Sequence, residues 1–531
     1  MKGFAELYAA LDRATATRDK LSALLAHFSA ADPLDAAWAV YVLGGGKLKR
    51  LLSSTELRAL AAQASGYPGW LIDETYAHVG DLAETLALVL GQGRNPAPEP
   101  GLSAWVSALE SLRGADAATR SAHILATWQT QDENTRLVYN KLVTGALRIG
   151  VSRGLLHQAL ARLSGLSSAE IAHRLSGEWQ VSAENWRALI DPTARPAEQA
   201  SRPYPFFLAS PLEDPPHSLG ARSDWLAEWK WDGIRAQLIR RAQGVEIWSR
   251  GEERLDGRFP ELEVALQALP SGTVLDGEIL AWRDSAPLAF QALQRRIGRL
   301  KPGPKLLSEC PVRFLAYDLL EHAGEDCRSA PLHVRRAELQ SLLAACADPR
   351  LGLSPAVDAD SWEALATRRT EARERAVEGL MLKRWDSPYQ VGRKRGDWWK
   401  WKIDALHIDA VLIYAQAGHG RRANLYTDYT FAVWDQERLV PIAKAYSGLD
   451  DREIAELDRW IRRHTLERFG PVRSVEALLV FELAFEGIQV STRHKSGVAL
   501  RFPRIARWRI DKTAAQADTL EALRALAHRR D

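Results

Sequence analysis

One lysine in a short run of alternating side chains constrains this chain more than any other feature. Residues Trp225–Trp231 alternate apolar and polar side chains, which predicts a strand, and Asp232-Gly233 predicts a turn into a returning strand over 234–239. Lys230 lies just before that turn. The pKa of an unperturbed lysine amine is about 10.4, so the amine becomes a nucleophile only where nearby cations or desolvation lower it. A chain that uses Lys230 covalently must therefore supply cations.

Acidic side chains follow on two predicted strands. Val274–Leu280 carries Asp276 and Glu278 two residues apart, so the two carboxylates share one strand face and repel unless a cation lies between them. Glu378 begins the next such strand. Because Mg²⁺ prefers one or two carboxylates together with water and substrate phosphates, Glu278 and Glu378 are the candidate metal ligands. An edge strand with solvated acids is the alternative for the first pair.

Cations gather in two later segments. Residues 387–404 hold five Lys and Arg side chains among three tryptophans, and Lys400 and Lys402 share one strand face. Two lysines on one strand face repel each other unless anions bind between them. We therefore expect Lys400 and Lys402 to bind phosphates and to help lower the pKa of Lys230. A solvated basic loop is the alternative. Residues 498–512 are dense in arginine, whose planar group binds phosphate oxygens in pairs.

In this order the segments resemble the motifs of covalent nucleotidyltransferases, and specifically those of ATP-dependent DNA ligases. They read Lys-Trp-Asp-Gly (230–233), Ser-Arg-Gly (249–251), Asp-Gly-Glu (276–278), Tyr-Asp (317–318), Glu-Gly-Leu-Met-Leu-Lys (378–383), Lys-Trp-Lys (400–402), and Arg-Phe-Pro-Arg with Arg-Ile-Asp-Lys (501–504 and 509–512). The resemblance covers about residues 1–512. It implies an enzyme that uses ATP and Mg²⁺ to seal nicks between a 5′-phosphate and a 3′-hydroxyl in duplex DNA. AMP would pass to the lysine and then to the 5′-phosphate, and the 3′-hydroxyl would displace it.

The resemblance also implies a role for each matching residue. Lys230 would attack the α-phosphate of ATP and become lysyl-AMP. The other implied contacts are Glu228 with adenine, Arg235 and Arg250 with ribose and with the sugar-phosphate of nicked DNA, Glu278 with ribose or metal, Glu378 with metal, Tyr317 stacked on adenine, Lys400 and Lys402 with the α-phosphate, and Arg501 and Lys512 with the pyrophosphate leaving group. One more cation is expected before the Lys-x-Lys strand. Arg393, Lys394 and Arg395 all fit, and an ungapped count from Tyr389 favours Lys394.

The pattern of the chain predicts three domains. Residues 1–200 are rich in Ala and Leu at helical spacing, which predicts an all-α domain, and residues 201–403 alternate strands with helices, as an α+β nucleotidyltransferase domain does. Residues 404–531 carry short strands typical of a small antiparallel β-barrel, and the resemblance implies an OB-fold. Between the first two domains, the proline-rich segment Pro192–Pro216 predicts an extended linker.

Within the helical region, Arg136–Ser152 resembles the signature of the DNA-binding domain of these ligases. Lys141 and Arg148 would then face phosphates in a sequence-independent mode, with a solvated helix face as the alternative. The segment Gly44–Arg50 looks phosphate-binding but lacks the spacing of a P-loop, so we expect a basic surface turn that touches DNA.

The composition of the chain limits the expected partners and the expected cellular location. The net charge of +3 does not by itself indicate a nucleic-acid partner, so that expectation depends on the local basic runs. The three cysteines form no Cys-x-x-Cys pair, which predicts a reduced cytosolic location and argues against the zinc module of NAD-dependent ligases. No apolar run reaches about 18 residues. We expect a cytoplasmic, nucleoid-associated monomer that binds nicked DNA and has no membrane partner.

Two other functions fit parts of this pattern. RNA ligases and mRNA-capping guanylyltransferases share the lysine motif and the barrel, but the helical N-terminal region and the Arg-Phe-Pro-Arg segment argue against them. A non-catalytic scaffold that binds nicks would need none of the catalytic residues, all of which are present.

Overall fold

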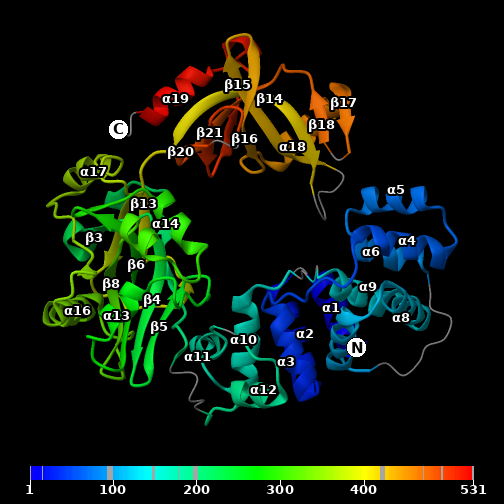
Figure 1. The fold of residues 1–531 in the computed structure, drawn as a ribbon, viewed down its shortest axis with the longest axis horizontal. Helices are drawn as coiled ribbons and strands as arrows, with labels where there is room; N and C mark the ends of the chain where they lie inside the picture. The colour runs from blue at the N-terminus through cyan, green and yellow to red at the C-terminus, as the bar shows by residue number, and fades with distance from the viewer. Residues whose placement is uncertain are drawn as a thin grey trace. The chain divides into compact units, whose positions relative to one another are not determined.

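The computed structural model divides the chain into two compact units, residues 1–15, 45–150 and 404–531 in one and residues 16–44 and 151–403 in the other. It describes residues 2–14, 16–91, 100–145, 147, 150–177, 179–194, 201–418, 425–470, 472–491 and 494–528. The described residues before 195 are helical, those of 201–403 mix strands and helices, and those after 403 are mostly β (Figure 1). The predicted boundaries at 200 and 403 stay predictions.

The N-terminal helices are short and strongly capped. In the first unit they are α1 (Lys2–Arg13), α4 (Ser54–Ser65), α5 (Gly69–Val79), α6 (Leu82–Val89), α7 (Leu102–Ser111), α8 (Ala117–Thr130) and α9 (Glu133–Thr144), and in the second α2 (Thr17–Ala30), α3 (Pro33–Leu43), α10 (Arg153–Ser164), α11 (Ser168–Arg174) and α12 (Ala183–Ile190). Ser53, Asp81 and Asp132 each cap a helix by accepting a backbone N–H, which satisfies an otherwise unpaired donor. Helix α9 is central, because it packs against α1 and α6 and is buried along most of its length.

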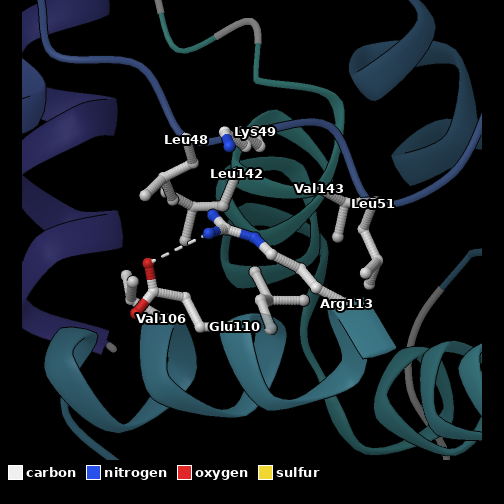
Figure 2. Close-up of a pocket in the computed structure, with 9 residues that line it drawn as sticks. Leu48, Lys49, Leu51, Val106, Glu110, Arg113, Leu142 and Val143 are labelled. Carbon is white, nitrogen blue, oxygen red and sulfur yellow. Dashed lines mark ion pairs between the residues drawn. The ribbon is translucent and has the colours of Figure 1, made fainter. Parts of the chain in front are cut away.

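The segment Gly44–Arg50 follows α3 as a turn. Lys47, Lys49 and Arg50 are exposed, which confirms the predicted basic surface turn. Figure 2 shows Leu48 and Leu51 directed toward Val143 and its neighbours, around a cavity of only about 10 Å³. A space of that size holds about one water molecule, so it offers no room for a nucleotide.

The middle region contains two sheets that share a core. The larger has strand order β10-β8-β6-β4-β5 and the smaller β2-β13-β11-β3. Their strands are β2 (Ser210–Pro211), β3 (Trp225–Trp229), β4 (Ile234–Arg241), β5 (Gly244–Ser249), β6 (Thr273–Arg283), β8 (Val312–His322), β10 (Leu351–Leu353), β11 (Gly379–Arg384) and β13 (Trp398–Lys402). Buried Ile239, Val274 and Leu320 from the larger sheet pack with Trp398 from the smaller. Helices α13 (Pro260–Leu266), α14 (Phe290–Ile297) and α16 (Leu332–Cys346) cover the larger sheet, and α17 (Trp362–Thr370) packs on the smaller.

The C-terminal region is built around one long strand, β14 (Leu406–Ala417). One edge of β14 pairs with β15 (Tyr426–Asp435), and its other edge pairs first with β19 (Val480–Phe485) and then with β18 (Val472–Val475). Register shifts within the β14–β15 pair bend the strands, as bulges do. The remaining elements are β16 (Arg438–Ala445), α18 (Asp451–Arg463), β17 (Thr465–Phe469), β20 (Gly487–Val490), β21 (Val498–Arg501), β22 (Arg504–Trp508) and α19 (Leu520–His528). The result is a β-rich, half-barrel region.

No helix in the described part of the chain has the length and apolar character needed to span a membrane.

Close packing of strands explains one glycine in the middle region. Gly277 lies on β6 between β4 and β8, and a Cβ there would come within 2.4 Å of both the Leu315 carbonyl oxygen and the Phe314 ring. Only glycine fits without moving the backbone of β8.

We therefore expect Gly277→Ala to lower the free energy of unfolding by about 1–3 kcal/mol, because overpacking displaces buried neighbours. Urea unfolding followed by tryptophan fluorescence measures it. Gly244→Ala is the matched control, since a Cβ on that strand glycine meets nothing within 4 Å. Equal stability of the two variants would contradict the account.

Candidate active site

Lys230 lies where β3 ends, and its backbone is fixed by the adjacent strand β11. The Lys230 N–H donates to the Gly379 carbonyl and the Glu378 N–H donates to the Lys230 carbonyl, both at 2.8 Å. The predicted hairpin is wrong, because β3 pairs with β11 whereas β4 pairs with β5 and β6 in the other sheet. Gly233 permits this crossing, since a Cβ there would lie 2.4 Å from the Ile279 carbonyl oxygen.

Glu378 joins two amines. Its Oε2 lies 2.7 Å from the Lys230 Nζ and 3.2 Å from the Lys402 Nζ. Strand pairing sets this up, because Lys402 on β13 is opposite Gly379, the residue after Glu378. Burial opposes the charged form of Glu378, but the two ammonium groups outweigh it and hold the pKa of the carboxyl below its usual value. The carboxylate therefore stays charged between the two lysines.

Lys400 lies on the same strand as Lys402 and is half-buried. Burial lowers the pKa of its amine, and the charges of Lys402, Arg393 and Lys230 lower it further. Of the three candidates for the cation expected before this strand, Arg393 is one whose charge lowers the pKa of Lys400. Arg395 is instead engaged elsewhere, 3.6 Å from Asp214 and over the Trp399 ring.

Asp276 and Glu278 have different surroundings on β6. Arg235 on β4 lies beside them and binds Asp276 through two nitrogens, at 3.2 and 2.7 Å, and the Tyr389 hydroxyl donates to the same carboxylate at 2.7 Å. The cation expected near this acidic pair is thus Arg235. In the part of the chain that the structure describes, the Glu278 carboxyl has no such partner, and burial raises its pKa to about 8 despite the opposing charges of Lys230 and Arg235.

A second cluster of ion pairs lies beneath Lys230. Glu228 shares the strand face of Lys230 and is 1% exposed. Its oxygens bind the Lys383 Nζ at 2.6 Å and the Arg336 Nη1 at 2.8 Å. The Lys383 amine lies 4.2 Å from the centre of the Tyr317 ring. Glu228 is therefore a buried anchor for two cations, which differs from the solvent-facing acceptor that an adenine contact suggests.

Several members of these clusters are difficult to recognise in the sequence as site residues. Lys383 ends the Glu-Gly-Leu-Met-Leu-Lys motif and gave a signal, since lysine is costly in an apolar strand without a partner. Arg336 gave none, because it reaches Glu228 from α16, 108 residues further along the chain. Tyr389 and Asp276 likewise meet only through the fold.

Other predicted residues have local contacts of their own. Arg250 is exposed after β5, and its backbone N–H donates to the Arg235 carbonyl at 3.0 Å. Arg501 and Lys512 belong to the other unit. There the guanidinium of Arg501 lies over the Phe502 ring, and Lys512 pairs with buried Asp409, which also binds Arg509 at 2.9 Å.

Lys141 forms an ion pair within the helical region. Its side chain is 8% exposed and pairs with Asp81, the cap of α6. It belongs to α9, which packs against α1 and α6, and its contact with DNA phosphates stays a prediction. Arg148 lies outside the described residues.

Models of known protein families match most of this chain. The family model described as ATP dependent DNA ligase domain matches residues 206–402, that of the DNA ligase N terminus residues 1–161, and that of the ATP dependent DNA ligase C terminal region residues 422–512. A probable DNA ligase of Koribacter versatilis is 37% identical over 87% of this chain and 84% of its own length. The chain belongs to the ATP-dependent DNA ligases.

Further matches agree with this assignment. DNA ligase 1 of Korarchaeum cryptofilum is 26% identical over 99% of this chain and 97% of its own length. The solved structure named Pmar-Lig_Pre has a TM-score of 0.63 at 15% identity, covering 95% of this chain and 99% of that one, which shows the shared fold. The resemblance seen in the sequence is thus confirmed. As a member of this family, the ligase uses ATP and seals DNA nicks through adenylate intermediates.

The raised pKa of Glu278 predicts how stability depends on pH. Between its ordinary pKa of 4.5 and the folded value of about 8, the folded state keeps a proton that the unfolded state releases. The free energy of unfolding therefore falls as pH rises through this window. Glu278→Gln removes the effect, so we expect the variant to gain about 1–3 kcal/mol over wild type between pH 5 and pH 8, as urea unfolding measures.

Glu374→Gln serves as the control, because Glu374 is exposed in the same region. Its stability should follow that of wild type at every pH. A constant difference between Glu278→Gln and wild type would show that Glu278 ionises normally in the fold.

Proposed function

We propose that Lys230 carries AMP in this ligase. The observation that supports this role is the contact of its amine with Glu378, which holds the side chain beside Lys402 and within reach of Lys400 and Glu278. The deprotonated Nζ would form a bond to the α-phosphorus of ATP as the bond to pyrophosphate breaks. Such a transfer asks the protein mainly for positioning and for neutralisation of phosphate charge.

The surrounding cations supply that neutralisation. Lys400 and Lys402 would bind the α-phosphate, and Arg393 is a better candidate for the third cation than Lys394, since its charge reaches Lys400. The Tyr317 ring lies near the cations of Lys383 and Arg235, and it would stack on adenine. Arg235 and Arg250 would contact ribose and the sugar-phosphate of DNA.

Glu378 and Glu278 fit a divalent cation such as Mg²⁺. The described residues include no cluster of three or more acidic, His or Cys side chains able to hold a metal. However, Mg²⁺ commonly uses one or two carboxylates and takes its remaining ligands from water and substrate phosphates. When bound, the ion would neutralise phosphate charge. The ion pair between Glu378 and Lys230 would break as the lysine amine reacts, and it would form again when AMP leaves the lysine.

The other regions would hold the DNA and complete the site. The helical region over residues 1–200 would bind duplex DNA, residues 201–403 would carry the nucleotide site, and residues 404–531 would form an OB-fold that presents Arg501 and Lys512 to pyrophosphate. Asp409 pairs with Lys512 and would orient it. We propose that the ligase works as a monomer on nicked duplex DNA.

Labelling with α-³²P-ATP and Mg²⁺, read on a denaturing gel, tests the role of Lys230. We expect wild type to become labelled and Lys230→Ala to remain unlabelled and unable to seal a nick, because the variant lacks the nucleophile. Lys444→Ala, which removes an exposed lysine of β16, should be labelled like wild type. Nicked duplex should discharge the label with sealing. Labelling of Lys230→Ala would refute the assignment, and labelling by GTP in place of ATP would indicate capping chemistry.

A further inference from the structure

A basic groove lies on the middle region, separate from the residues around Lys230. It has a volume of about 550 Å³ and runs between α14 and α15 (Pro304–Glu309). Its charged and polar lining comes from Arg295, Arg299, Lys301, Lys305 and Glu309. These residues lie outside the sequence motifs that resemble those of ATP-dependent DNA ligases.

The cations of the groove outnumber its acid. Glu309 is shared by Arg295, at 2.8 Å, and by Lys305, at 3.8 Å. Arg299 and Lys301 are exposed, and neither forms an ion pair with any carboxylate in the described part of the chain. Four cations around one carboxylate leave the groove strongly positive, which favours an anionic partner.

The walls of the groove are fixed by two other arginines. Arg296 is fully buried at the end of α14, donates to the Cys310 carbonyl at 2.7 Å, and pairs with Glu261. Arg283, at the end of β6, donates to the Glu309 carbonyl at 2.5 Å. The two helices are thus tied to each other and to the sheet. Arg295 and Lys305 lie on these helices, and Arg299 and Lys301 lie in the short segment that connects them.

We propose that this groove binds backbone phosphates of the duplex that flanks the nick, an inference that rests on the proposed function. The same strand connects groove and site, because β6 carries Glu278 and ends at Arg283, five residues further and roughly 17 Å along the strand. That distance corresponds to roughly five base pairs at 3.4 Å each. With the duplex lying along β6, the groove contacts phosphates about five base pairs from the sealed bond, and it contributes to DNA affinity without taking part in lysyl-AMP formation.

The test compares Arg299→Gln/Lys301→Gln with wild type for binding to nicked duplex in EDTA without ATP. We expect the Kd of the variant to rise about tenfold and the slope of log K against log salt to become shallower by about 2, since two phosphate contacts are lost. Lysyl-AMP formation should equal that of wild type, which also shows that the variant folds. Arg373→Gln/Arg384→Gln removes two exposed cations of the same region and should bind DNA like wild type.

Neutral methylphosphonates locate the contact. Placed four to six phosphates from the nick on one side, they should weaken binding by wild type and by the control pair, and leave the groove variant unchanged. The inference would be overturned if the groove variant and wild type had equal Kd values and equal salt slopes. It would also be overturned if the methylphosphonates weakened the binding of both proteins equally. Failure of wild type to form lysyl-AMP or to seal a nick would instead overturn the proposed function.

Discussion

The arrangement of the site depends on one carboxylate. Glu378 binds Lys230 and Lys402 through the same oxygen, and so connects the end of β3 to β13 through β11. Without that negative charge, two ammonium groups would face each other in a partly buried space. With it, the amine proposed to react is held in place, and a second cation is kept where a phosphate of ATP would lie. Positioning of this kind is the main contribution a protein makes to nucleotidyl transfer.

Ion pairs also fill the layer between the two sheets. Arg235 binds Asp276, Glu228 binds Lys383 and Arg336, and the fully buried Asp318 binds Arg335. Such pairs repay the cost of removing charges from water only when their geometry is good and further hydrogen bonds satisfy them, and breaking one is strongly destabilising. Most of these residues are held by more than one contact, as Asp276 is by Arg235 and Tyr389. Burying these charges costs free energy of folding, and their mutual contacts hold them in a fixed arrangement around the proposed nucleotide site.

Local motifs single out residues that the structure brings together, whereas the path of the chain between them was not predictable. Lys230, Glu378, Lys400 and Lys402 each lie within a few residues of a recognisable strand pattern, and their roles in the reaction stay predictions. The hairpin was wrong, since Asp-Gly is a common turn signal and nothing local shows that the chain crosses to another sheet. The ion pair of Lys141 with Asp81 was not predictable, because the two residues are far apart in the sequence and only the fold brings them together. Partners such as Arg336 depend on long-range packing, which no short pattern reveals.

Peptide mass spectrometry after incubation with ATP and Mg²⁺ tests the central claim most directly, because Glu378 contacts both Lys230 and Lys402, and Lys400 lies on the same strand as Lys402. We expect AMP on the peptide that contains Lys230, and we expect Lys400 and Lys402 to be unmodified. Stable AMP on Lys400 or Lys402, with Lys230 unmodified, would contradict it.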